Sequence, residues 1–435
     1  MGENGLTALR ILILARAVHP LHGVGGLERH IHDLTRHLLG RGATVTLVTP
    51  PPRSSAGRTP DPGDAVFGHE RLTTRFVPYR TFPFAGRRGT TILDRNTAYP
   101  LFGWRAGRLA RRLVAQGAAQ IVQGYGAAAL GYALARARDP LETVPFIFNP
   151  QGLEEFGGTD PARAPLKRLA YRPLQAAVRA CASAADRVVA TDQALVPVVT
   201  GHLGVPRWKA PVIPNAVDLD RFASRPADES RRLRHSIGAG DGDSLLVAVG
   251  RLEANKGFHV LVEALARLAR AAPAPAPSRP PWRLVLIGDG PRRAALRRQV
   301  RETGLQERVH LLGRVADESV HAWYAAATLF VHPTLYEGSS LVTLEAMAHR
   351  RAVVATTAGG IPDKVVPGIT GWLVPPGDAV ALAGALRAAL AGRERLPAMG
   401  EAGRAVVERR FAWPAVTDRL LALYDEVLHP RQAGR

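Results

Sequence analysis

The chain has few of the residues that cross-link a fold or anchor it in a membrane. Its 435 residues include a single cysteine, Cys181, which excludes an internal disulfide framework and a cysteine-rich metal site. This composition favours a reducing, cytoplasmic compartment. No segment reaches the roughly 18 uncharged apolar residues of a spanning helix. The short apolar run at residues 9–15 is expected to be a buried first strand rather than a signal sequence.

Lysine is also scarce, with four residues, although the formal net charge is +20. Such a charge is typical of nucleic-acid-binding proteins, because phosphate contacts need a basic surface. The arginines are scattered along the whole chain, however, and no known nucleic-acid-binding module accompanies them. We therefore expect no nucleic-acid partner.

One group of arginines is clustered rather than scattered. In the helical pattern at residues 104–115, Arg105, Arg108, Arg111 and Arg112 fall within about a third of the helix circumference. A solvated face of a surface helix is the simpler interpretation. The alternative is peripheral contact with an anionic membrane or with an anionic lipid-linked acceptor.

Apolar runs alternate with helical patterns along the chain, which predicts parallel sheets covered by helices. The first series comprises residues 9–15, 44–48, 121–125, 144–149 and 187–191. A second series starts at 245–250 and continues at 284–288, 309–313, 329–333 and 352–356. Proline and asparagine interrupt the periodicity at 212–218, so we predict two doubly wound domains with a boundary there. Open α/β sheets bind ligands at the carboxyl ends of their strands, which predicts a substrate site between the domains.

Two glycine-containing loops follow predicted strands. In HGVGG at 22–26, Gly25 and Gly26 precede a helix whose amino end can hold a phosphate. A dinucleotide fingerprint would need glycine at position 28, where the chain has Glu28, so a nicotinamide cofactor is disfavoured. In GRLEANKG at 250–257, Arg251 and Lys256 could contact both phosphates of a pyrophosphate.

The segment YEGSSLVTLEAMA at 336–348 carries two glutamates. A helix is expected to begin near Ser339 or Ser340, which places Glu337 in the preceding loop and Glu345 inside the helix. Neither glutamate stands where a capping box would need it. Both therefore become candidates for ligand binding.

Seven motifs, taken in order, resemble glycosyltransferase family 4, a group of retaining enzymes that use nucleotide sugars. They are GVGGLERH at 23–30, PNAVDLDRF at 214–222, GRLEANKG at 250–257, LVLIGDGP at 284–291, YEGSSLVTLEAMA at 336–348, AGGIPD at 358–363 and GITGWLVPPGD at 368–378. The resemblance implies an α/β fold of the GT-B type, with two Rossmann-like, doubly wound domains facing across a cleft. It implies an acceptor-side domain at 1–212, a donor domain at 213–405 and a closing helix at 406–435 that returns to the first domain.

The resemblance also implies roles for single residues. Arg251 and Lys256 would bind the diphosphate of the donor, and Glu337 would contact the transferred sugar; these three form the expected catalytic set. Glu345 would accept hydrogen bonds from the ribose. The other expected donor contacts are Gly25, Gly26, Arg314, Gly338, Ser339, Ser340 and Leu341.

The implied reaction is that of a glycosyltransferase of the EC 2.4 class, moving a sugar from a nucleoside diphosphate sugar to an acceptor hydroxyl. Cations and helix-start amides would stabilise the leaving phosphate, so no metal and no cofactor are expected. The acidic doublets at 218–220 and 241–243 are interpreted as coincidental rather than as metal ligands. Front-face attack would give retention, with a covalent intermediate on Glu337 as the lesser alternative.

The acceptor side departs from the family pattern. Many relatives carry a histidine after the strand at 144–149, whereas this chain has Gln151 there, close to Asn149. Glutamine cannot act as a base. A nucleotide-sugar epimerase remains the alternative on the same fold. A phosphorylase would need a lysine for a pyridoxal cofactor, and none of the four lysines has a clear setting for it. The complete set of donor residues disfavours a binding-only protein. The sequence does not identify the transferred sugar, the nucleotide base of the donor or the acceptor.

Overall fold

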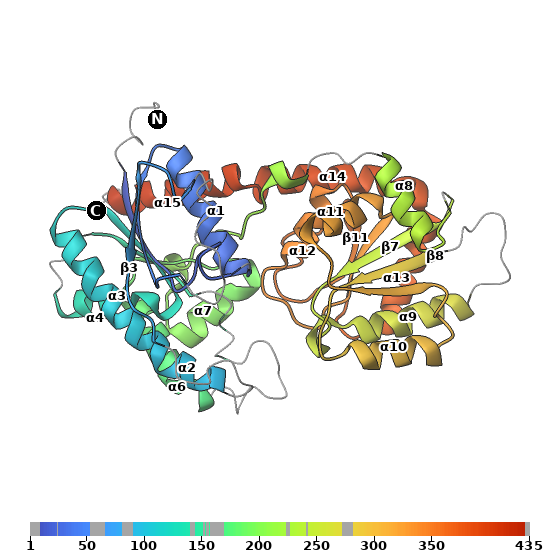
Figure 1. The fold of residues 1–435 in the computed structure, drawn as a ribbon, viewed down its shortest axis with the longest axis horizontal. Coiled ribbons are helices and arrows are strands. Elements are labelled where there is room, and N and C mark those ends of the chain that lie inside the picture. The colour runs from blue at the N-terminus through green and yellow to red at the C-terminus, as the bar shows by residue number, and fades with distance from the viewer. Residues whose placement is uncertain are drawn as a thin grey trace. The chain divides into compact units, whose positions relative to one another are not determined.

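The computed structural model describes residues 9–23, 25–52, 66–80, 90–139, 144–150, 153, 156, 169–222, 227–240, 242–271 and 282–430. By its contacts the chain divides into two units (Figure 1). Unit 1 comprises Met1–Asn215 and Trp413–Arg435, and unit 2 comprises Ala216–Ala412. The contacts therefore place the first boundary after residue 215 and the return to unit 1 at residue 413, where the sequence suggested 212 and 406.

Unit 1 is built on a six-stranded parallel sheet in the order β3-β2-β1-β4-β5-β6. This is the strand order of a doubly wound, Rossmann-like fold. The strands are β1 (Arg10–Leu14), β2 (Thr44–Thr49), β3 (Leu72–Phe76), β4 (Ile121–Tyr125), β5 (Phe146–Asn149) and β6 (Arg187–Val188). The helices are α1 (Gly26–Gly40), α2 (Thr90–Asn96), α3 (Ala98–Ala115), α4 (Leu130–Arg138), α6 (Arg172–Ala184), α7 (Val196–Leu203) and α15 (Trp413–Leu428).

Unit 2 repeats this topology, with the order β12-β11-β10-β7-β8-β9. Its strands are β7 (Ser244–Val249), β8 (Trp282–Ile287), β9 (Val309–Gly313), β10 (Leu329–His332), β11 (Ala352–Thr356) and β12 (Gly371–Val374). Its helices are α8 (Ala227–Ser236), α9 (Phe258–Arg270), α10 (Arg293–Glu302), α11 (Asp317–Ala326), α12 (Leu341–Ala348), α13 (Ala379–Ala391) and α14 (Leu396–Arg410). The prediction of two doubly wound parallel sheets is confirmed.

The central strands of unit 2 are buried on both faces, which explains their unbroken apolar sequences. Along β7, Leu246 and Ala248 join one core cluster, whereas Leu245 and Val247 join the other. Helices α9, α10 and α13 cover the first face, and α11 and α12 cover the second (Figure 1). The sheet is thus a rigid layer between two apolar cores, and its loops carry the polar residues.

Two strands were missed by the sequence analysis, and both lie at a sheet edge. In β3 (LTTRF), the side chains are half-buried or exposed, and in β12 (GWLV) the middle two are half-buried. An edge strand pairs on one side only and needs no continuous apolar run. Its sequence therefore resembles that of a loop.

The last helix, α15, belongs to unit 1 and packs against α1 and β4. The ring of Trp413, which is 2% exposed, stacks on His37 and lies 5.4 Å from the His30 ring. Tyr424 donates a hydrogen bond to Gln123 on β4. Burial lowers the pKa of His30 to about 4, so that this histidine is neutral at pH 7.

Truncation of Trp413 tests how strongly α15 stabilises unit 1. Replacing a buried tryptophan by alanine removes its packing and leaves a cavity, so Trp413→Ala should destabilise the protein by about 3–5 kcal/mol. Trp208→Ala is the matched control, because Trp208 lies in the same unit and is 66% exposed. The denaturant concentration at the midpoint of unfolding reports the stability of each variant. Equal midpoints would show that the ring does not stabilise the fold.

Candidate functional site

Three loops of unit 2 lie side by side because they follow neighbouring strands. The loops at 250–257, 333–340 and 357–361 leave the carboxyl ends of β7, β10 and β11, which are adjacent and parallel in the sheet. Ligands of open α/β sheets bind at this edge. The loops bring together residues that are far apart in the sequence, among them Lys256 and Glu337.

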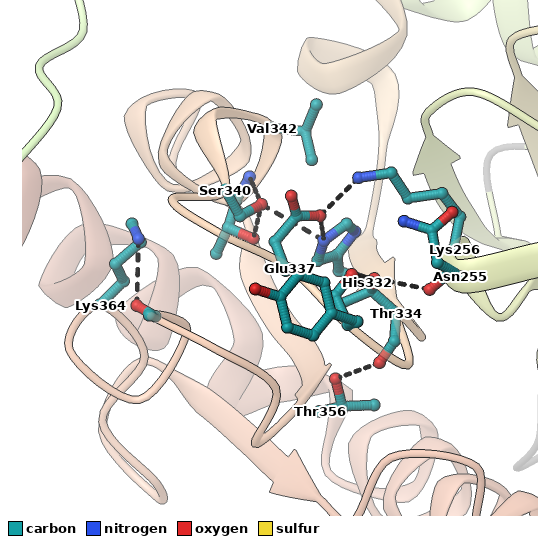
Figure 2. Close-up of polar contacts among 12 residues, drawn as sticks. Asn255, Lys256, His332, Thr334, Glu337, Ser340, Val342, Thr356 and Lys364 are labelled. Carbon is teal, nitrogen blue, oxygen red and sulfur yellow. Dashed lines mark hydrogen bonds and ion pairs between the residues drawn. The ribbon is translucent and has the colours of Figure 1, made fainter. Parts of the chain in front are cut away.

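The first two loops are joined through their backbones. The carbonyl oxygen of Asn255 accepts a hydrogen bond from the Thr334 hydroxyl at 3.0 Å (Figure 2). It accepts a second one from the Leu335 amide at 2.7 Å. Gly257 has a φ of +67°, and a Cβ there would lie 1.9 Å from the carbonyl oxygen of Pro333. Only glycine combines this conformation with such a close approach.

The third loop packs under Glu337. Gly359 has a φ of +53°, and a Cβ there would lie 1.8 Å from the carbonyl oxygen of Glu337. The hydroxyl of Thr356 donates to the carbonyl oxygen of Thr334 at 2.7 Å. The backbone that carries Glu337 is therefore held from two sides.

The Glu337 carboxylate lies between two basic side chains. Its Oε2 atom is 2.6 Å from Nζ of Lys256 and 3.1 Å from Nε2 of His332 (Figure 2). The side chains of Glu337 and Lys256 are 14% and 19% exposed, so water screens this pair only weakly. Burial alone would raise the pKa of Glu337, but His332 and Lys256 together lower it to about 2. Glu337 is therefore ionised at neutral pH.

The amino end of α12 adjoins this carboxylate. Ser340 is the N-cap, and its hydroxyl accepts a hydrogen bond from the Thr343 amide. The amides of the helix's first turn carry partial positive charge and have no partner within the helix. Among the described residues, no partner reaches the buried Ser339 hydroxyl. This helix start can hold an anionic group.

Glu345 lies inside α12, where Tyr324 of α11 donates a hydrogen bond to its Oε2 atom at 3.0 Å. Burial, and then the nearby Glu345 charge, raise the pKa of Tyr324 well above its ordinary value. The tyrosine therefore remains a donor at neutral pH. His349 stacks on the Tyr324 ring with the centroids 5.6 Å apart, which fixes the ring.

Two of the other predicted donor residues of unit 2, Arg251 and Arg314, are exposed. Arg251 is 77% exposed and its guanidinium is 2.7 Å from Glu253. Arg314 follows β9 and is exposed, whereas Gly338 and Leu341 flank the start of α12 and are half-buried. The structure thus brings Lys256, Glu337 and Ser340 into direct contact with the His332 network and leaves Arg251 and Arg314 outside it.

The predicted residues of unit 1 belong to another sheet. Gly25 is the N-cap of α1 and Gly26 is its first residue, so both stand at a helix start after β1. Asn149 ends β5 and is buried. Gln151 lies outside the described residues.

Two residues of the site were missed by the sequence analysis. His332 appears in the sequence only as the end of an apolar strand, and Tyr324 as an aromatic residue of a helix. The one available signal was the position of His332 at the carboxyl end of a central strand, five residues before Glu337. Tyr324 meets Glu345 through tertiary packing, which leaves no local pattern.

Neither a metal cluster nor a spanning helix is found in the part of the chain that the structure describes. No group of three or more histidine, cysteine, aspartate or glutamate side chains there could hold a metal ion. Every helix in the same ranges is too short or too polar to cross a bilayer.

Comparison with known proteins adds two family matches that together span both units. Residues 24–221 match the model described as Glycosyltransferase Family 4, and residues 243–392 match the model described as Glycosyl transferases group 1. The first covers the sheet of unit 1 from α1 onward, and the second covers the loops that carry Lys256 and Glu337. The motifs noted in the sequence fall almost entirely inside these two ranges.

Curated relatives match over part of their length. A GDP-mannose-dependent alpha-(1-6)-phosphatidylinositol monomannoside mannosyltransferase of Mycolicibacterium smegmatis is 34% identical over 228 residues, which is 51% of this chain and 57% of that protein. A D-inositol 3-phosphate glycosyltransferase of Nocardia farcinica is 34% identical over 260 residues, 58% of this chain and 55% of that protein. The matched part spans little more than half the length of these relatives.

Solved structures share the fold. Sucrose-phosphate synthase from Thermosynechococcus elongatus superimposes with a TM-score of 0.70 at 23% identity, covering 97% of this chain and all of that one. The Anabaena protein HepE, solved in complex with UDP, gives a TM-score of 0.68 at 19% identity and covers 96% of this chain and all of its own. At these identities the likeness concerns the fold alone.

The contact below Glu337 can be tested with two glycines of unit 2 that both have positive φ. Gly359→Ala adds a clash with the Glu337 carbonyl to the conformational strain, whereas Gly368, with a φ of +75°, has open space around it. Gly368→Ala should cost about 1–2 kcal/mol for the left-handed conformation. Gly359→Ala should lower the denaturant midpoint clearly further. Equal midpoints would show that the loops do not constrain each other.

Proposed function

Because the chain belongs to the glycosyltransferases of family 4, group 1, we propose that it transfers a sugar from a nucleoside diphosphate sugar to an acceptor hydroxyl. Unit 2 would bind the donor, and unit 1 would bind the acceptor. The reaction would retain the anomeric configuration and serve the synthesis of a cell-surface polysaccharide, glycolipid or glycoconjugate. The relatives from Mycolicibacterium smegmatis and Nocardia farcinica are both named as glycosyltransferases, which supports this class of reaction.

One observation carries the proposal: an ionised carboxylate, a lysine and a helix start converge at the strand ends of unit 2. Lys256 and the first-turn amides of α12 provide positive charge for a diphosphate. Glu337 is ionised and accepts hydrogen bonds, as the hydroxyls of a sugar require. Glu345, held by Tyr324, would accept from the ribose.

The proposed chemistry follows from the charges. The bond between the anomeric carbon and the phosphate oxygen breaks as negative charge builds on the phosphate, and Lys256, Arg251 and the helix-start amides would stabilise it. The acceptor hydroxyl would attack the same face and pass its proton to the departing phosphate oxygen. In this scheme Glu337 positions the sugar, and no metal or cofactor takes part. Gly25 and Gly26 would approach the distal phosphate, and Asn149 and Gln151 would face the acceptor.

A thermal-shift screen with UDP-glucose, GDP-mannose and ADP-glucose tests donor binding. A ligand present at a hundred times its Kd should stabilise the protein by about 2.7 kcal/mol. With the nucleotide sugar that binds, Glu337→Ala should lower turnover about tenfold to a hundredfold, because a hydrogen bond to a charged group contributes about 1.5–3 kcal/mol. Affinity for the nucleoside diphosphate should change little.

Glu401→Ala is the control for this variant, since Glu401 is an exposed residue of the same unit whose partner is Arg350. Normal turnover in Glu337→Ala would remove the assigned role. Release of nucleoside diphosphate only when an acceptor is added would support transfer. Interconversion of the donor sugar without an acceptor would instead identify an epimerase, and unchanged activity in EDTA is expected for a reaction without metal.

We also propose a cytoplasmic location with peripheral contact to an anionic membrane, based on the surface of α2 and α3. Helix α3 exposes Leu101 and Trp104 together with four arginines, of which Arg111 is paired with Asp139. The Arg108 guanidinium lies 4.9 Å above the Trp104 ring. Helix α2, which contacts α3, exposes Ile92 and Leu93. Aromatic and apolar side chains beside arginines suit the boundary between lipid headgroups and acyl chains. This α2–α3 surface comprises Ile92, Leu93, Leu101, Trp104, Arg105, Arg108 and Arg112.

Vesicle co-sedimentation tests the α2–α3 surface. The protein should bind vesicles that contain phosphatidylglycerol, and binding should weaken with salt and with neutral phosphatidylcholine vesicles. Trp104→Ala with Arg108→Ala should weaken binding about fivefold or more, since each arginine near an anionic surface contributes about 1 kcal/mol. Trp208→Ala should bind normally, because this exposed tryptophan also has cations over its ring but lies outside the surface. Equal binding to both vesicle types would exclude the contact.

A further inference from the structure

We propose that His332 is a positioning residue of the transfer site, which keeps the Glu337 carboxylate in place when the donor diphosphate draws Lys256 away. This inference rests on the proposed function and adds a residue to it. Three observations support the role. The His332 ring is buried and makes defined contacts, it contacts the Oε2 atom of Glu337, and Lys256, which contacts the same atom, has a flexible side chain.

The His332 ring is buried and is held through its Nε2 atom. It ends the central strand β10 and is 1% exposed. Its Nε2 atom lies 3.1 Å from Oε2 of Glu337 and 3.3 Å from the hydroxyl of Ser340 (Figure 2). Histidine has only two side-chain torsions, and a ring that is already buried loses little further conformational entropy when it makes a contact. It is therefore a rigid partner for the carboxylate.

The hydrogen on this ring can be assigned from its partners. A carboxylate only accepts, so Nε2–H must donate to Glu337, with the Ser340 hydroxyl as a second, longer contact. Among the described residues, no partner reaches the buried Nδ1 atom of His332. A proton there would be a buried donor without an acceptor, which is costly. We therefore assign a hydrogen to Nε2, the atom that faces the Glu337 carboxylate.

Lys256 approaches the same oxygen from another loop. Its ammonium lies 2.6 Å from Oε2 of Glu337, at the end of a flexible four-carbon chain. In the described part of the chain, both Lys256 and His332 contact Oε2 of Glu337, which leaves Oε1 for the hydroxyls of a ligand. Both basic side chains thus hold one oxygen and present the other.

A diphosphate competes with Glu337 for the Lys256 ammonium. Once the ammonium turns toward the phosphates, Glu337 loses its closest cation and gains negative neighbours. His332 cannot follow, so its Nε2–H remains on Oε2 and Oε1 keeps its direction toward the sugar. The contact with Ser340 links the same ring to the helix start that would face the phosphates. In this way His332 couples the position of the sugar to that of the diphosphate.

Two substitutions separate the hydrogen bond from the shape of the ring. Glutamine can place an N–H near the position of Nε2, whereas phenylalanine fills the space without a donor. We expect His332→Phe to lower turnover of the nucleotide sugar found by the thermal-shift screen by about tenfold to a hundredfold. We expect His332→Gln to recover most of this loss. Titration calorimetry with UDP or GDP alone should give similar Kd values for all three proteins.

A double-mutant cycle with Glu337→Gln tests whether His332 acts through that residue. If it does, His332→Phe should cause little further loss in the Glu337→Gln background. Full additivity of the two losses, or equal weakening of binding to the nucleoside diphosphate and to its sugar derivative, would overturn the positioning role. If wild-type protein bound none of the three nucleotide sugars, the proposed function would fail, and this inference with it. Normal donor turnover in His332→Phe would reject the inference alone.

Discussion

The site of unit 2 depends on the backbone carbonyl of Asn255, which holds the loops at 250–257 and 333–340 in direct backbone contact. The oxygen accepts hydrogen bonds from the Leu335 amide and from the Thr334 hydroxyl, and Gly257 lets the loops come into backbone contact. Lys256 and Glu337 each lie within two residues of these contacts. Because the loops leave adjacent parallel strands, the sheet determines where they start, and the carbonyl determines how closely they meet.

This arrangement solves an electrostatic problem. A carboxylate as deeply buried as Glu337 would ordinarily take up a proton, since burial disfavours the charged form. Lys256 and His332 reverse that tendency and lower its pKa to about 2. The same carboxylate therefore remains an acceptor over the neutral pH range. Glu345 is held differently, by a neutral tyrosine and inside a helix, so the two glutamates of one motif have separate supports.

Much of the fold could be predicted from sequence because the central strands are buried on both faces. Their apolar runs mark β1, β2, β4 and β5 in unit 1 and β7, β8, β10 and β11 in unit 2, and apolar runs also marked the edge strands β6 and β9. The edge strands β3 and β12 were not predicted, since their half-buried or exposed residues form no apolar run. Among the site residues, Lys256 and Glu337 were predicted from motifs, whereas His332 and Tyr324 were not. His332 and Tyr324 each act by contacting a glutamate, and nothing in the sequence around them identifies that glutamate as their partner.

The sequence by itself determined the two doubly wound sheets, the family resemblance and the chemical types available at the strand ends. Those features are local, because apolar periodicity, glycine-rich loops and motif spacing are written along the chain. Tertiary structure alone decided that Lys256 and His332 share one oxygen of Glu337, that Tyr324 reaches Glu345, and that Arg251 lies at the surface. Such contacts join residues from different strands and helices, and only the packed sheet brings them within hydrogen-bonding distance.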